Sequence, residues 1–101
     1  MILDWRKTMN PHVTEDMRQL FLAMLSLETV EECEAFFEDI CTIKELQDLS
    51  QRLAVAKMLY GGEKYQTIEE ETGASTATIS RVNKCLNYGS GGYRAVLERL
   101  K

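Results

Sequence analysis

The most constraining feature of this sequence is a helical spacing of apolar residues that continues from Thr14 almost to the end of the chain. Apolar residues recur every three or four positions, which is the pattern of amphipathic helices. Three segments also open with a Ser/Thr-x-x-Glu signal, in which the two side chains cap a helix start reciprocally. These signals begin at Thr29, Thr42 and Thr67. The pattern predicts an all-α fold and contains no candidate strand.

Turn residues divide the pattern into six predicted helices. Their expected starting points are Thr14, Thr29, Thr42, Thr67, Ser75 and Tyr93. The third helix should end at Gly61-Gly62 and the fourth at Gly73, because glycine readily adopts the left-handed conformation that closes a helix. The fifth helix is expected at about residues 76–86, and the turn-rich segment 87–92 separates it from the last one.

A chain of 101 residues has room for one domain. We expect residues 1–12, which contain the single proline, to form an N-terminal arm, and residues 13–101 to form one helical domain. Phe21, Phe36 and Phe37 lie on broad apolar faces of the first two predicted helices. Because so short a chain has little else to cover them, we expect a homodimer, with burial inside a monomer as the alternative.

Composition argues against several classes of protein. No apolar run approaches the roughly 18 residues of a membrane span, and the start at Met1 lacks the apolar core of a signal peptide. Cys33, Cys41 and Cys85 form no C-x-x-C pair, which favours free thiols in the cytoplasm. With His12 as its one histidine, no phosphate loop and no nucleophile beside a base, the chain is not expected to be an enzyme. We also expect no metal and no cofactor.

The charge is unevenly distributed along the chain. The net charge is −4, whereas nucleic-acid-binding proteins are usually basic. Residues 1–60 carry six Lys/Arg and eleven Asp/Glu, but residues 76–101 carry five Lys/Arg and one Asp/Glu. An acidic body with a basic C-terminal quarter is compatible with one DNA-facing surface. Ordinary surface variation is the alternative explanation.

A helix-turn-helix is predicted at about residues 65–86. Gly73 occupies the sharp turn, where a side chain would clash. Ile68 precedes the turn, and Ile79 and Val82 follow it, so that apolar contacts can fix the angle between the two helices. The rest of the second helix carries hydroxyls and alanine where surface helices usually carry Glu and Lys. Small side chains let such a helix enter the major groove of DNA.

The candidate DNA-binding residues lie on the exposed faces of these two helices. They are Gln66, Ser75, Thr76, Ala77, Ser80, Arg81 and Lys84. We expect Thr76, Ala77 and Ser80 to meet base edges, while Arg81 and Lys84 reach the phosphate backbone. The glutamates at positions 69–71 weigh against this interpretation, because they would repel nearby phosphates.

Seven blocks of sequence, in order, resemble the Trp-repressor-related family called YerC/YecD. The blocks are Leu20-Phe21-x-Ala23, Glu31-Glu-Cys, Phe36-Phe-Glu-Asp, Cys41-Thr-x-Lys-Glu-Leu, Gln51-Arg-Leu-x-Val-Ala, Ala74 through Val82 and Leu86-Asn-Tyr-Gly. The resemblance implies a six-helix Trp-repressor-like fold in an intertwined homodimer. It also implies a sequence-specific regulator of transcription, by default a repressor, that binds a two-fold symmetric operator in double-stranded DNA. The Trp repressor is itself a standard example of helix-turn-helix docking, with recognition helices about 34–36 Å apart.

The resemblance also concerns a small-molecule pocket. Arg52 and Arg81 match two arginines that enclose the tryptophan corepressor of the Trp repressor, and Thr42 matches a threonine that lines the pocket. Val82 stands where the repressor has a glycine that leaves room for the indole. Cys85 stands in place of a serine that binds the ligand's amino group, and a thiol is a weaker hydrogen-bonding partner. These five residues form the expected effector pocket. We expect no tight binding of tryptophan, and either another effector or none.

Three points stay open at this stage. Gln66 and Glu69 stand where the repressor's first helix of the motif carries basic residues, so its operator sequence does not transfer. An ion pair with Asp48 is the alternative role for Arg52. A helical protein–protein interaction module, whose helix-turn-helix does not bind DNA, is the alternative function, and the acidic balance is compatible with it. Binding through phosphates would weaken steeply with salt, whereas docking through an apolar patch would not.

Overall fold

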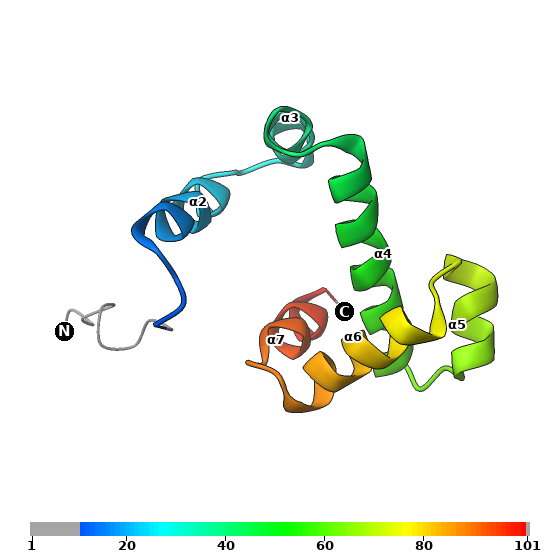
Figure 1. The fold of residues 1–101 in the computed structure, drawn as a ribbon. Coiled ribbons are helices and arrows are strands. Elements are labelled where there is room, and N and C mark those ends of the chain that lie inside the picture. Colours follow the sequence, from blue (N-terminus) through cyan, green and yellow to red (C-terminus); the bar gives the residue numbers. More distant parts are fainter. Residues whose placement is uncertain (1–10, 101) are drawn as a thin grey trace. The chain divides into compact units, whose positions relative to one another are not determined.

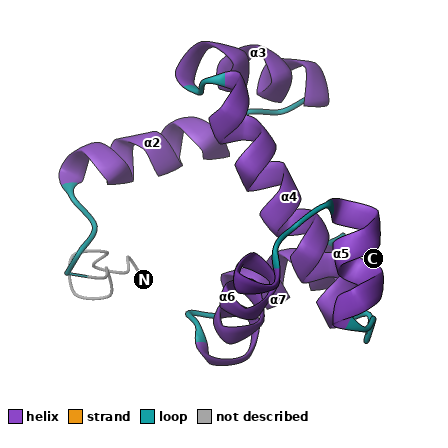
Figure 2. Cartoon of the chain, turned by 45° about the vertical axis from the view of Figure 1, so that its right-hand side comes forward, coloured by secondary structure: helices purple, strands orange, loops and turns teal. Residues whose placement is uncertain are grey.

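In the computed structural model, which describes residues 11–100, the chain forms six helices and no strand within that range. The helices are α2 (Glu15–Leu25), α3 (Val30–Ile40), α4 (Ile43–Tyr60), α5 (Tyr65–Thr72), α6 (Thr76–Tyr88) and α7 (Gly92–Arg99) (Figures 1 and 2). The predicted all-α class is confirmed. Most of the expected N-terminal arm, residues 1–12, lies outside the described residues, and the division into an arm and one domain stays a prediction.

Two of the predicted capping signals act as helix starts. At α4, Thr42 Oγ1 accepts a hydrogen bond from the Glu45 N–H at 3.1 Å, and Glu45 Oε1 accepts one from the Thr42 N–H at 2.9 Å. Hydrogen bonds from the Thr42 backbone and hydroxyl lower the pKa of the Glu45 carboxyl. At α3, Thr29 Oγ1 accepts from the Glu32 N–H, but the Glu32 carboxylate accepts from the N–H of Glu28.

The third predicted signal, at Thr67, was wrong. α5 begins at Tyr65 with Lys64 in the capping position and no side-chain cap, so Thr67 lies inside the first turn. The Glu70 carboxylate accepts a hydrogen bond from the side-chain amide of Gln66 at 3.4 Å instead. Tyr65 packs against the core of the molecule. We attribute the earlier start to this burial, which outweighs the roughly 1 kcal/mol of a side-chain cap.

Glycine closes α4 and α5 as expected, with one difference in detail. The left-handed residue after α4 is Gly62, at φ 84°, whereas Gly61 keeps a helical conformation. The N–H of Gly62 donates to the Leu59 carbonyl and the N–H of Glu63 donates to the Met58 carbonyl, both at 3.0 Å. This pair of bonds satisfies carbonyls that the helix end would otherwise leave without partners.

The contacts group the described residues into two units, residues 11–40 and residues 41–100. In the second unit α4 packs against α5, α6 and α7, and α6 also packs against α5 and α7. Every buried residue of the described range belongs to this unit. The core consists of Val55, Ala56, Ile68, Ala74, Ile79, Val82, Leu86 and Leu97.

The first unit contains α2 and α3 and has no buried residue in either helix. Phe36 and Phe37 contact each other edge to face, with ring centroids 5.5 Å apart, and both are half-buried. Phe21 is 47% exposed and Leu25 is 82% exposed. The apolar faces that the sequence predicts are therefore formed in this unit, and the contacts between α2 and α3 leave them largely uncovered.

Candidate nucleic-acid interface

Residues 65–88 form two helices joined by a tight turn. α5 ends at Gly73, whose φ of 73° is in the left-handed region and whose N–H donates to the Glu69 carbonyl at 2.9 Å. The chain then turns into α6, where Ser75 Oγ accepts from the Thr78 N–H at 3.1 Å. The predicted turn at Gly73 and the predicted cap at Ser75 are both confirmed. α6 extends two residues beyond the expected end near residue 86.

The inner face of α6 is fixed by apolar contacts. Ile68 on α5 and Ile79 on α6 are fully buried, and Val82 is 2% exposed. These side chains belong to the same core as Val55 and Ala56 of α4. Because close-packed interiors leave little freedom for a helix to shift, α4 and α5 hold α6 at a defined angle. The sequence predicted this role, fixing the angle between the two helices, for Ile68, Ile79 and Val82.

A hydrogen-bonded link strengthens the junction between α4 and the turn. The Gln51 side-chain amide donates to the Thr72 carbonyl at 3.1 Å. The Thr72 hydroxyl donates to the Ile68 carbonyl at 2.6 Å and accepts from the Ala74 N–H at 3.1 Å. The last turn of α5 is thus bonded both to α4 and to the residue that leads into α6. Neither Gln51 nor Thr72 was predicted from the sequence to form this link.

The outer face of α6 is open to solvent. All seven candidate DNA-binding residues, from Gln66 to Lys84, are exposed. Thr76, Ala77 and Ser80 lie in the first turns of α6, with Arg81 and Lys84 further along the same helix. The helix therefore combines a buried apolar face with an exposed face of small, hydroxyl-bearing and basic side chains.

Some of the candidate side chains already have partners within the chain. The Ser75 hydroxyl caps α6 and also donates to the Thr78 hydroxyl. The Thr76 hydroxyl donates to the carboxylate of Glu69 on α5. Glu69 is half-buried at this position, whereas Glu70 and Glu71 are exposed. Glu69 therefore lies at the N-terminal end of α6. Glu69 and Thr76 are seven residues apart in the sequence, and nothing in the sequence pattern predicted that they would be in contact.

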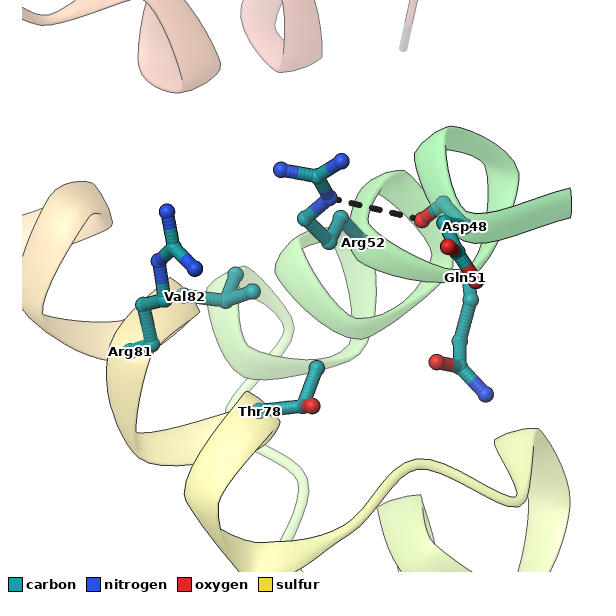
Figure 3. Close-up of a pocket in the computed structure, with 6 residues that line it drawn as sticks. All are labelled: Asp48, Gln51, Arg52, Thr78, Arg81 and Val82. Atoms are coloured by element: carbon teal, nitrogen blue, oxygen red, sulfur yellow. Dashed lines mark hydrogen bonds between the residues drawn. The ribbon is translucent and has the colours of Figure 1, made fainter. Parts of the chain in front are cut away.

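A pocket with a volume of about 280 Å³ lies between α4 and α6 (Figure 3). Asp48, Gln51 and Arg52 line it from α4, and Thr78, Arg81 and Val82 line it from α6. The guanidinium groups of Arg52 and Arg81 extend toward the same side of the pocket (Figure 3). The pocket therefore presents two cations beside the aliphatic side chain of Val82.

The structure brings together three of the five residues expected in an effector pocket: Arg52, Arg81 and Val82. Thr42 caps α4 and does not line this pocket. Cys85 lines a different, mostly apolar cavity of about 520 Å³, together with residues such as Leu53, Tyr93 and Val96.

Three residues that line the pocket were not predicted to do so from the sequence: Asp48, Gln51 and Thr78. The four-residue spacing of Asp48 and Arg52, and of Thr78 and Val82, could have identified two of them, because residues four apart share a helix face. The alternative role for Arg52, an ion pair with Asp48, was wrong. Arg52 Nε donates to the Asp48 backbone carbonyl at 3.4 Å. The Asp48 carboxylate pairs instead with Lys44, also at 3.4 Å.

Metal sites and membrane-spanning helices are both absent from residues 11–100. No group of three or more His, Cys, Asp or Glu side chains in this range is arranged to hold a metal ion. None of the helices there is both long enough and apolar enough to cross a membrane. The cysteines at positions 33, 41 and 85 are free.

Comparisons with known proteins agree with this geometry. Residues 15–101 match the family model described as Trp repressor protein. The uncharacterised protein YerC of Bacillus subtilis (strain 168) is 58% identical over 87 residues, which cover 86% of this chain and 84% of YerC.

Two solved structures are similar along most of their length. A TrpR-like protein from Eubacterium eligens ATCC 27750 is 59% identical, with a TM-score of 0.83 over 86% of this chain and 90% of that one. A candidate Trp repressor from Staphylococcus aureus is 47% identical, with a TM-score of 0.82 over 98% and 95% of the two chains. The predicted resemblance to the YerC/YecD group and the Trp-repressor-like fold are confirmed. The chain belongs to the Trp repressor family.

Proposed function

We propose that this chain is a sequence-specific regulator of transcription, by default a repressor, that binds double-stranded DNA as a homodimer with α6 in the major groove. The observation that carries the proposal is the two-sided character of α6. Ile79 and Val82 anchor its inner face, while Thr76, Ala77 and Ser80 leave its outer face exposed and free of bulky side chains. A recognition helix needs both properties, because it must be held rigidly and must also fit between the groove walls.

The distribution of basic side chains supports contact with phosphates near α6. Arg81 and Lys84 are exposed on the helix and form no ion pair within the described residues. Arg94, by contrast, forms hydrogen bonds within the fold. It donates to the Leu86 carbonyl and to Asn87 Oδ1, both at 3.0 Å, so it joins α7 to the end of α6. Arg81 and Lys84 are therefore the better candidates for neutralising phosphates.

The homodimer is supported by large apolar side chains that are exposed in each of the two units. α2 and α3 bury no residue, although both have a pronounced apolar face. Leu25 is 82% exposed, and Ile43 and Leu100 are 78% and 68% exposed. A second copy would cover such surfaces and would also supply the second recognition helix that a two-fold symmetric operator requires. We propose that the regulator acts in the cytoplasm, where reducing conditions keep its cysteines free.

We further propose that tryptophan is not a tight ligand of the pocket between α4 and α6. Val82, 2% exposed, packs into the core and presents an aliphatic wall there. Thr42 and Cys85, which the resemblance placed in the pocket, do not line it, so neither can contact a ligand bound there. Calorimetric titration should show no micromolar binding of tryptophan in the presence or absence of operator DNA. A micromolar dissociation constant would contradict this expectation.

The substitution Ala77→Glu tests the position of α6 in the groove. A carboxylate at this exposed position should abolish specific binding, because it adds bulk and negative charge where the helix meets the DNA. Ala95→Glu is the matched control, since Ala95 is exposed on α7 and the change of charge is the same. Both variants should keep the helicity and the dimer of the wild type. Unchanged binding by Ala77→Glu would show that this helix does not enter the groove.

A protein–protein interaction module is the second candidate function. The observation that favours it is the number of exposed apolar side chains, among them Phe21 and Leu25. The two functions differ in their response to salt. DNA binding through phosphates should weaken steeply as salt rises, whereas apolar docking should change little.

A further inference from the structure

Glu69 is the one acidic residue of α5 that the fold positions at the start of α6. Its carboxylate accepts a hydrogen bond from the hydroxyl of Thr76, the first residue of α6. Glu70 and Glu71 follow on the same helix but are exposed, and no hydrogen bond joins either of them to α6. We infer that Glu69 is a specificity-determining residue that selects cytosine at one base pair of each half-site. This inference rests on the proposed function, because it requires α6 to bind DNA.

The electrostatic surroundings favour a carboxylate in this place. The N-terminus of a helix carries a partial positive charge, and Thr76 opens the thirteen-residue α6. Within residues 11–100, no Lys or Arg side chain forms an ion pair with Glu69. The carboxylate is thus oriented by one hydroxyl, and its remaining lone pairs are available to a donor on another molecule.

The position also fits contact with bases. In helix-turn-helix complexes the N-terminal residues of the recognition helix meet the base edges. Thr76 lies at this end of α6, beside the exposed Ala77, so its hydrogen-bonded partner lies at the same end. The hydroxyl fixes the direction of the carboxylate and reduces the number of rotamers that binding must order.

The chemistry of a carboxylate then determines which base it selects. An ionised carboxylate only accepts hydrogen bonds. In the major groove, cytosine presents a donor, its N4 amino group, whereas guanine presents two acceptors. Adenine places the N7 acceptor beside its N6 donor, and thymine presents an acceptor and a methyl group. Cytosine is therefore the base that Glu69 favours, and the guanine edge repels it.

This role also explains an acidic residue on a surface that faces DNA. A glutamate that served only as a solvated surface residue would weaken binding to every duplex through repulsion from phosphates. A glutamate held against a cytosine weakens binding to the wrong sequences more than to the right one, which increases specificity.

The experiment compares wild type with three variants on duplexes that differ at single base pairs. The starting duplex is the one selected by the wild type from a random library, and affinities are measured by fluorescence anisotropy at fixed salt. Wild type should prefer cytosine at one position of each half-site by about 10-fold to 100-fold. Glu69→Gln should transfer the preference at that position toward adenine, because an amide can accept from N6 and donate to N7.

Glu71→Gln is the matched control, because it removes the same charge from an exposed residue of the same helix. It should raise the affinity for all duplexes by a similar factor and leave the order of base preference unchanged. Thr76→Val keeps the carboxylate but removes its hydrogen-bond donor, and it should reduce the preference for cytosine several-fold. If Glu69→Gln does not fold, as judged by circular dichroism, Glu69→Ala replaces it, because Thr76 is itself a candidate for a base contact. Glu69→Ala should lose the preference for cytosine without gaining one for adenine.

Two results would overturn the inference, and they differ in what else they overturn. If Glu69→Gln and Thr76→Val keep the wild-type order of base preference, Glu69 does not contact a base, while the proposed function stands. If the wild type enriches no sequence from the library, both the inference and the proposed function fail.

Discussion

The two units of this chain carry equally clear helix signals but differ in what they bury. Residues 11–40 begin one helix at Thr14 and another at Thr29 with side-chain caps, yet neither helix has a buried residue. Residues 41–100 contain all eight buried residues of the described range. The difference shows that capping and apolar spacing determine where helices form. They do not ensure that the apolar faces of those helices are buried.

The source of helix stability also differs between the two units. Isolated helices of about eleven residues are only marginally stable in water, so α2 and α3 need tertiary packing to persist. The second unit supplies such packing internally, because α4 contacts each of α5, α6 and α7. We therefore expect the first unit to depend on a partner subunit and the second to depend mainly on its own core.

The largest effect on the second unit should come from Ile79→Ala. Ile79 is fully buried, so the substitution removes buried methylenes and leaves a cavity in the core. The free energy of unfolding should fall by about 2–5 kcal/mol, measured by urea denaturation. Ile79→Val should cost only about 0.5–1.5 kcal/mol. Equal and small losses for both variants would contradict a close-packed core at this position.

A charge on the apolar face of the first unit should separate the subunits. Phe21 is 47% exposed within the chain, but it becomes desolvated if a second copy covers it. Phe21→Glu should then weaken dimerisation by roughly 100-fold, because a buried charge without a partner is costly. Sedimentation equilibrium measures this change. Gln19→Glu, an exposed position on the same helix, is the control, and an equal effect of both variants would argue against a dimer through this face.

A smaller effect is expected at the turn between α5 and α6. Gly73 has a φ of 73°, which costs a residue with a side chain about 1–2 kcal/mol. The clash expected there from the sequence is wrong, because a Cβ at Gly73 would meet no atom within 4 Å. Gly73→Ala should therefore lower the free energy of unfolding by the conformational cost alone. Thermal unfolding followed by circular dichroism provides the measurement. An unchanged midpoint would show that the turn tolerates another conformation.

The smallest effect concerns the capping box at the start of α4. Thr42→Ala should cost about 1 kcal/mol, as is usual when a threonine cap is lost. The hydrogen bonds from Thr42 lower the pKa of Glu45 below its ordinary value of 4.5 in the folded chain. The stabilisation by the ionised Glu45 is therefore fully present above pH 4.5 and lost as the pH falls through the lowered pKa.

Glu45→Gln provides the check on this pH dependence. The difference in unfolding free energy between wild type and this variant should shrink as the pH falls below 4.5. A difference that stays constant down to low pH would show that the Glu45 carboxylate does not stabilise the helix start.

The sequence predicted most of the fold because its signals are local. Caps at Thr42 and Ser75 and the closing glycine at position 73 act within a few residues, so periodicity and spacing locate them. The signal at Thr67 failed because a tertiary contact, the packing of Tyr65 on the core, determined the start of α5. Local patterns carry no information on such contacts.

The candidate site was less predictable than the fold, because it depends on residues far apart in the sequence. The placement of Glu69 beside Thr76 requires the sharp turn between two helices, and the pocket requires α4 and α6 to lie together. Arg52 and Arg81, which the resemblance to the Trp repressor placed together, both line that pocket, and its role as an effector site stays a prediction. The resemblance did not indicate that Cys85 would line a separate cavity.

The most direct test of the central claim is selection of bound duplexes from a random library, followed by anisotropy titration of the selected duplex at several salt concentrations. A DNA-binding homodimer should enrich a two-fold symmetric motif whose half-sites lie about one helical turn apart. Its affinity should fall steeply as salt rises. Enrichment of no sequence, together with no salt-sensitive binding to any duplex, would contradict the claim and favour a protein partner.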